Sequence, residues 1–194
     1  MEIVKRFENM AEKSSAKVLY FKNLDEIMMY CIELVDKKNM TDILMKDKRK
    51  SNSFKTIAID EDVDIDINKF ALLCSEKNIK LIQNNLRDYV GGIDVGITNA
   101  EFGIARTGTV VVNTARESTR LLSMISEIHL ILLKQKNILM DFSDIVSNLS
   151  KYMEQETSYI SFITGPSRTA DIERVLTLGV HGPEEVNILI LEEL

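Results

Sequence analysis

Cysteine and proline are scarce in this chain of 194 residues, with two of each, and glycine occurs only eight times. The low proline and glycine contents argue against a disordered or low-complexity chain. Cys31 and Cys74 lie far apart, and two thiolates are too few for a typical iron–sulfur cluster or a secreted disulfide framework. Because Cys31 falls on an apolar helical face, we expect it to be a buried, reduced thiol.

Long apolar runs and targeting signals are also missing from the sequence. No run approaches the ~20 apolar residues that a membrane-spanning helix needs. The first residues, MEIVKRFENMAEK, contain no apolar stretch of the kind found in a signal peptide. We therefore expect a cytoplasmic protein that does not associate with a membrane.

Basic residues are outnumbered, since 24 Lys and Arg face 30 Asp and Glu and leave a formal charge of −6. An acidic surface repels phosphate backbones, so nucleic acid is not an expected partner. The segment from Lys46 to Lys55 (KDKRKSNSFK) is locally basic. We interpret it as a solvated loop.

The length suits one domain, residues 1–194, to which an N-terminal helix of about residues 1–14 could be appended. Strands and helices alternate in the first half, and Asn23 can cap one helix with Glu26 three residues later. Such βα units favour a parallel sheet. We therefore predict an α/β fold with an open, mostly parallel sheet and helices on both faces. The expected strands are Val18–Phe21, Asp42–Met45, Thr56–Ile59 and Ile79–Gln83.

The second half differs because a tight hairpin is expected within it. Gly108 in the turn Thr107-Gly108 can adopt positive φ, which suits such a turn. A helical stripe of apolar residues begins after Asp141. The expected strands are Val95–Thr98, Phe102–Arg106, Thr109–Asn113, Ile128–Leu133, Tyr159–Thr164 and Asn187–Leu191.

The turn Gly165-Pro166-Ser167-Arg168-Thr169 follows a strand, and we expect a short helix to begin there. Because helix N-termini present unpaired N–H groups, the turn could hold a phosphate or carboxylate through Ser167 and Arg168. In the alternative interpretation Ser167 or Thr169 only caps the helix, while Arg168 pairs with Asp171 or Glu173.

Two acid–base candidates accompany this turn. His181, in His181-Gly182-Pro183, could act as an acid, a base or a hydrogen-bond donor, or could simply tie down a turn. Glu101 precedes Phe102, so burial could raise its pKa, although an exposed carboxylate is equally consistent with the sequence. Thr107, Gly108 and Thr109 could offer hydroxyl and amide donors to an anion, or could serve the hairpin alone.

Arg116, Arg120 and His129 are the remaining polar residues between the strands. Arg120 could clamp a carboxylate or phosphate, or could form a surface ion pair. His129 begins an apolar run, which favours a core histidine. With two histidines and no HExxH motif we expect no metal site, and no GxGxxG or GxxxxGK[ST] loop is present.

Taken together, these segments resemble the LUD domain, the family that includes lactate utilization protein C and YkgG-like proteins. The resemblance rests on DVGITNAEFGIARTGTVVV, then Arg120 and His129, then ITGPSRTADIE and GVHGPEEVNILIL. It covers about the second half of the chain. The family usually has an acidic residue where Arg106 stands. The resemblance implies a fold like the NagB/RpiA/coenzyme A transferase group.

The resemblance also implies a role in oxidising L-lactate to pyruvate. It implies no cofactor in this chain, with iron–sulfur clusters or flavin carried by partner proteins. The alternative, by fold analogy, is a coenzyme A transferase-like or sugar-phosphate isomerase-like enzyme, or a protein that binds a phosphorylated or coenzyme A-linked small molecule. An interaction module without a ligand is the third possibility, and the sequence leaves a homo-oligomer open.

The candidate site residues form two groups. Glu101 and His181 are the expected proton-transfer groups. The expected ligands of a small carboxylate or phosphorylated molecule are Thr107, Gly108, Thr109, Arg120, Gly165, Ser167, Arg168 and Asp171. These residues come from two distant segments, one around Thr107 and one around Arg168, and we expect the segments to meet in one anion-binding cleft.

Overall fold

A computed structural model describes residues 2–38, 54–89, 92–146, 149, 159–169, 177–178 and 182–192. Its larger sheet has six strands in the order β1-β12-β7-β4-β2-β3, and every neighbouring pair is parallel. These strands are β1 (Lys17–Phe21), β2 (Lys55–Ile59), β3 (Ile79–Ile82), β4 (Ile93–Ala100), β7 (Ser126–Lys134) and β12 (Glu185–Leu191).

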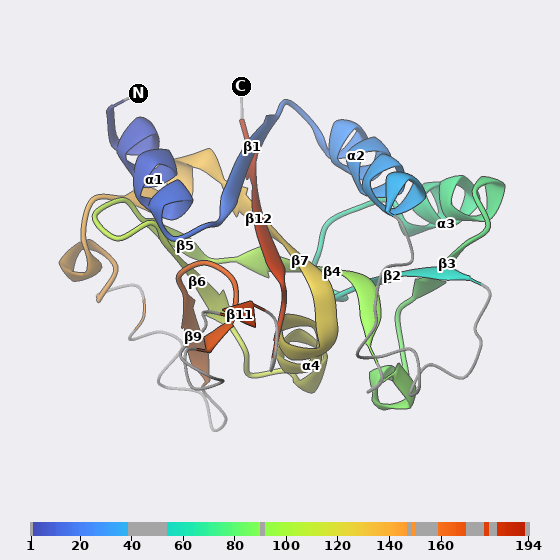
Figure 1. Ribbon diagram of the computed structural model, residues 1–194. Helices are drawn as coiled ribbons and strands as arrows, with labels where there is room; N and C mark the ends of the chain where they lie inside the picture. The colour runs from blue at the N-terminus through green and yellow to red at the C-terminus, as the bar shows by residue number, and fades with distance from the viewer. Residues whose placement is uncertain are drawn as a thin grey trace.

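Helices lie against both faces of the larger sheet (Figure 1), as the sequence predicts. Alternation along β7 shows why: Ile128, Leu130 and Leu132 pack in one core, whereas Ile131 and Leu133 pack in the other. The first core contains α2 (Leu24–Lys37) and α3 (Ile67–Glu76). The second contains α1 (Glu2–Lys13), and α4 (Glu117–Ile125) packs beside it.

A smaller sheet, in the order β8-β5-β6-β9, lies on the α1 side of the larger one (Figure 1). Strands β5 and β6 form the predicted antiparallel hairpin, and Gly108 in its turn has a φ of 66°. The prediction of this hairpin is confirmed, whereas the sheet around it was not foreseen. Its strands are β5 (Phe102–Ile104), β6 (Thr109–Asn113), β8 (Ile138–Leu139) and β9 (Ile160–Ile163).

The N-terminus of α2 shows how local sequence sets the boundary of an element. The Asn23 side chain accepts a hydrogen bond from the Glu26 backbone N–H at 2.9 Å. The Glu26 carboxylate in turn accepts one from the Lys22 N–H at 2.9 Å. This reciprocal cap is the one predicted from the spacing of Asn23 and Glu26.

The sequence predicts that a short helix begins within Gly165–Thr169. This prediction is wrong for the last two of these residues. Arg168–Thr169 is strand β10, which pairs antiparallel with β11 (Thr177–Leu178). Pairing with a segment further along the chain overrides the local capping signal. Helix α4 was not predicted, and of its apolar side chains only Leu122 is buried. The strand expected at Asp42–Met45 and the basic residues 46–53 lie outside the described residues.

Short 3₁₀ turns complete the chain where the strands end. The helix expected from Asp141 begins as one of them, with Asp141 as its cap, and about half of its expected length lies outside the described residues. None of the helices in the described ranges is both long and apolar enough to cross a bilayer. The 3₁₀ turns are η1 (Leu86–Tyr89), η2 (Gln135–Asn137) and η3 (Phe142–Asp144).

Candidate functional site

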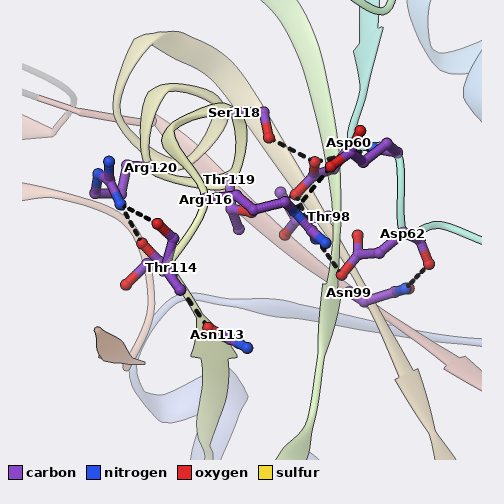
Figure 2. Close-up of polar contacts among 12 residues, drawn as sticks. Asp60, Asp62, Thr98, Asn99, Asn113, Thr114, Arg116, Ser118, Thr119 and Arg120 are labelled. Atoms are coloured by element: carbon purple, nitrogen blue, oxygen red, sulfur yellow. Dashed lines mark hydrogen bonds and ion pairs between the residues drawn. The ribbon is translucent and has the colours of Figure 1, made fainter. Parts of the chain in front are cut away.

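Polar side chains gather where β2 and β4 end, at the carboxyl edge of the larger sheet (Figure 2). Asp60 follows β2 directly, and its backbone N–H bonds the Ile97 carbonyl of β4 at 3.0 Å. The chain order reverses here, because β3 flanks β2 on one side and β4 flanks it on the other. Ligands of open α/β sheets bind at such reversal points, beyond the carboxyl ends of the strands.

Asp60 is the centre of this cluster and is only 2% exposed. Its carboxylate accepts hydrogen bonds from Ser118 Oγ at 2.8 Å and from Thr119 Oγ1, both in the first turn of α4. The Glu61 N–H donates to it at 2.9 Å, and Arg116 Nη2 donates at 3.3 Å. A buried carboxylate needs such partners, and the positive N-terminal end of a helix stabilises it further.

Arg116 pairs with Glu61 and Asp62 as well as with Asp60, and so links three acidic residues of one loop. Its Nη2 lies 2.5 Å from Asp62, and its Nε lies 3.6 Å from Glu61. Burial lowers the pKa of Arg116, but Asp62 and Asp60 outweigh this effect and raise the pKa overall. Burial raises the pKa of the Asp62 carboxyl, although Arg116 opposes the change. The loop is also tied to β4, because Asn99 Nδ2 donates to the Asp62 carbonyl at 2.6 Å.

Two hollows of about 450 and 630 Å³ open beside this cluster. They share Asp60, Glu61, Gln83 and Asn84, so they form one depression across the ends of β2 and β3. The smaller hollow, called the β2–β3 hollow below, continues over the first turn of α4 at Glu117 and Ser118. A ligand in it would touch the turn that holds Asp60.

His129 lies fully buried on β7, where Thr98 Oγ1 of β4 is 2.8 Å from its Nε2. Nδ1 has no hydrogen-bond partner among the described residues. Burial lowers the pKa of His129 to about 4, so the ring is neutral near pH 7. The prediction of a core histidine is therefore confirmed.

A separate charged cluster lies at the opposite, amino edge of the larger sheet. Lys38 bridges Glu127 and Asp94, with a distance of 3.1 Å to Asp94. Asp94 also accepts from the Thr56 N–H at 2.7 Å and from Thr56 Oγ1 at 2.8 Å. Burial opposes ionisation of Asp94, but Lys38 and Thr56 hold its pKa below the ordinary value. These contacts tie α2 to the starts of β2, β4 and β7.

The segments 107–109 and 164–168 meet in space, at the carboxyl end of α1. Thr109 Oγ1 lies 2.7 Å from Thr107 Oγ1 and 2.8 Å from Thr164 Oγ1, so these three hydroxyls bond one another. A Cβ on Gly108 would come within 2.1 Å of the Ala11 nitrogen. The Thr107-Gly108-Thr109 turn therefore packs against α1.

Gly165 and Arg168 hold the same end of the helix. A Cβ on Gly165 would lie 2.0 Å from the Ser14 carbonyl, and Arg168 Nη2 donates to that carbonyl at 2.5 Å and to Ser15 Oγ at 2.7 Å. The Ser167 N–H bonds the Pro183 carbonyl at 3.1 Å. In this arrangement Arg168 caps the carboxyl end of α1.

The remaining candidates do not join this group. Arg120 Nη1 points away from Asp60 (Figure 2) and donates to the Thr114 and Ala115 carbonyls at 2.6 and 2.7 Å. Glu101 lies between β4 and β5, where its backbone bonds Val111 and Asn137. Arg106 forms an ion pair with Asp141 at 2.5 Å. Asp171 and His181 lie outside the described residues.

The cluster around Asp60 was not among the residues singled out from the sequence, although Arg116 was noted. A usable signal was present, since Asp60 follows the buried run Thr56–Ile59 immediately. A carboxylate just after a buried parallel strand lies at the edge where ligands bind. Its partners in α4 could not be identified without the helix.

The LUD domain family model matches residues 4–191. This chain belongs to the LUD domain family. Curated relatives are similar to about half of the chain. YkgG of Escherichia coli (strain K12) is 38% identical over 102 residues, which are 51% of this chain and 44% of YkgG. The lactate utilization protein C of Macrococcus caseolyticus (strain JCSC5402) is 30% identical over 103 residues, or 52% and 45% of the two chains.

A second lactate utilization protein C, from Bacillus subtilis (strain 168), is 32% identical over 103 residues, 52% of this chain and 43% of that protein. The chain thus covers less than half the length of these curated relatives. The crystal structure of a DUF162 family protein from Deinococcus radiodurans has a TM-score of 0.63 at 15% identity. That match covers 98% of this LUD chain and 96% of the other, and it shows a common fold.

Proposed function

We propose that this LUD protein takes part in the oxidation of L-lactate to pyruvate, as a subunit that works with iron–sulfur or flavin partner proteins. The observation that carries the proposal is the family match across residues 4–191, with relatives named lactate utilization protein C. The proposed contribution of this chain is to bind a small molecule at the carboxyl edge of the larger sheet.

The two cysteines support a division of labour in which partners carry the electrons. Cys31 on α2 and Cys74 on α3 are both buried in the core that those helices form. Burial raises the pKa of both thiols, that of Cys74 to about 11, so both are protonated near pH 7. Two buried thiols cannot supply the thiolate ligands of an iron–sulfur cluster.

The carboxyl edge of the larger sheet supports the proposed binding role. Asp60 in the wall is held there by Ser118 of α4 and by Arg116 at the start of that helix, rather than by a loose loop. The β2–β3 hollow beside them has a volume of about 450 Å³, enough for a small molecule. The proposal requires only binding by this chain, and it assigns the chain no chemical step.

Gene deletion in the organism of origin tests the function. We expect the deletion strain to grow normally on pyruvate and to lose growth on L-lactate as sole carbon source, with growth restored by the wild-type gene. Affinity capture of the tagged chain from lactate-grown cells should recover an iron–sulfur or flavin protein. Unchanged growth on L-lactate after deletion would contradict the proposal.

A further inference from the structure

The β2–β3 hollow carries information about the kind of ligand it accepts. It opens between the loop after β2 and the loop after β3, next to the first turn of α4. The polar residues that matter for its chemistry are Asp60, Gln83, Asn84, Asn85, Asp88 and Ser118.

The amide side chains in this wall have unused hydrogen-bonding capacity. Gln83, Asn84 and Asn85 are exposed and make no side-chain hydrogen bond within the described ranges. An amide group donates and accepts, as a hydroxyl group does, so three adjacent amides match a ligand that carries several hydroxyls. The Asp88 carboxylate lies beside them and can accept from two vicinal hydroxyls, as carboxylates do with ribose.

The charges around the hollow do not suit an anion. Among the residues that the structure describes, Arg87 is its one cationic wall residue, and its Nε donates to Glu117 at 2.9 Å. Arg116, just behind the wall, is bound to Asp60 and Asp62. Four acidic residues line the hollow together with this single guanidinium, so its described wall is net negative and a free carboxylate or phosphate would be repelled. They are Asp60, Glu61, Asp88 and Glu117.

Asp60 strengthens this discrimination through its position. In many α/β proteins the first turn of a helix at the carboxyl edge holds a ligand phosphate. Here the first turn of α4 already holds an anion, because Ser118 and Thr119 donate to the Asp60 carboxylate. The protein's own side chain thus occupies the place that an anionic ligand group would take.

We propose that the β2–β3 hollow binds the vicinal diol of an uncharged sugar or nucleoside, and that Asp60 keeps carboxylates and phosphates out of it. This inference rests on the proposed function only in that it names the ligand class of the same site. Lactate itself, as a free anion, would then be handled by a partner protein.

Titration of the ¹⁵N-labelled full chain, followed by NMR, tests this inference with five probes. D-Ribose and adenosine supply the diol in two forms, and 2′-deoxyadenosine is the matched nucleoside without it. L-Lactate and inorganic phosphate are the anions. We expect adenosine, ribose or both to shift the side-chain amide signals of Gln83 and Asn84, while 2′-deoxyadenosine binds at least about tenfold more weakly. The two anions should cause no saturable shift.

Two variants locate the binding. Asn84→Ala should weaken diol binding by about tenfold, because it removes one donor and acceptor pair. Asn68→Ala is the matched control, since Asn68 is an exposed amide on α3 outside the hollow. Ribose binding alongside adenosine would identify a sugar ligand, whereas adenosine binding alone would identify a nucleoside.

Three results would overturn the inference. They are saturable shifts with lactate or phosphate at Gln83 and Asn84, equal binding of adenosine and 2′-deoxyadenosine, and no shift with any diol. The growth assay is a separate measurement, which tests the proposed function and not the ligand class. A chain that restores growth but ignores diols would overturn the inference while leaving the proposed function intact.

Discussion

At the scale of single residues, the Asp60 side chain holds together the polar cluster at the carboxyl edge of the larger sheet. Its carboxylate satisfies two hydroxyls, one backbone amide and part of a guanidinium, all within a nearly buried pocket. A substitution of Asp60 removes several interactions at once. Asp64, four residues later, is exposed and provides a comparison.

Asp60→Ala should therefore lower the free energy of unfolding by about 2–4 kcal/mol, because the hydroxyls and Arg116 lose a buried acceptor. Urea denaturation followed by circular dichroism measures the change. Asp64→Ala is the control and should stay within about 0.5 kcal/mol of wild type. Equal stability of the two variants would show that Asp60 does not organise this edge.

His129 predicts a pH dependence of stability. Its pKa is about 4 in the folded chain and about 6.5 when unfolded, so the unfolded chain binds the proton first as the pH falls. The stability should decrease from about pH 6.5 down to about pH 4, by about 3 kcal/mol in all.

The check is the melting temperature of wild type and His129→Gln between pH 4 and 7. Glutamine keeps a polar group near Thr98 but does not titrate in this range. We expect the variant to be less stable at pH 7 and to have a shallower dependence on pH. Parallel curves for both proteins would assign the acid sensitivity to other groups.

At the scale of elements, the segments 107–109 and 164–168 act on α1. Gly108 and Gly165 adopt φ values of 66° and 78°. Gly108 approaches the backbone of α1, and Gly165 approaches Ser14 just after it, too closely for a Cβ. The polar groups of these segments bond one another and Ser14, which accounts for their composition without a ligand.

Gly165→Ala should lower the free energy of unfolding by about 2 kcal/mol or more, because it adds strain at positive φ and a clash with Ser14. Hydrogen exchange should show faster exchange of the α1 amides in this variant. Gly182→Ala is the matched control, since a Cβ there would meet Ser167 Cβ at 3.1 Å and requires only a small shift. Unaltered α1 protection in Gly165→Ala would contradict this role.

The same elements show what the sequence could and could not predict. Apolar runs such as Thr56–Ile59 and Ile128–Leu133 identify buried strands, because hydrophobicity in a parallel sheet is nearly continuous. The Asn23 cap and the Gly108 turn depend on neighbouring residues only. Strand β10, by contrast, forms because residues 168–169 pair with 177–178, and a local pattern cannot report that contact.

The site was harder to foresee for a related reason. Arg168 and Thr107 have the composition of an anion site, but the structure directs Arg168 to the end of α1 and Thr107 to Thr109. Asp60 and Ser118 come together only because α4 and β2 meet at one edge of the sheet. That distance along the chain hides the cluster from any motif search.

At the scale of the whole molecule, the fold separates the apolar core that stabilises the chain from the polar depression proposed to bind a ligand. The cysteines and the largest apolar core lie under α2 and α3, while the polar depression opens at the carboxyl edge of β2 and β3. The proposed role in lactate utilization rests on relatives that carry that name, and the depression is where this chain would contribute to it.

Lactate-dependent oxygen uptake in the deletion strain tests this account most directly. The strain would carry wild type, a Gln83→Ala/Asn84→Ala double variant, or the Asn68→Ala control, each at matched protein levels. The account predicts that wild type and the control restore uptake, whereas the double variant restores less than about a tenth of it. Full uptake with the folded double variant would show that the β2–β3 hollow is not the working site.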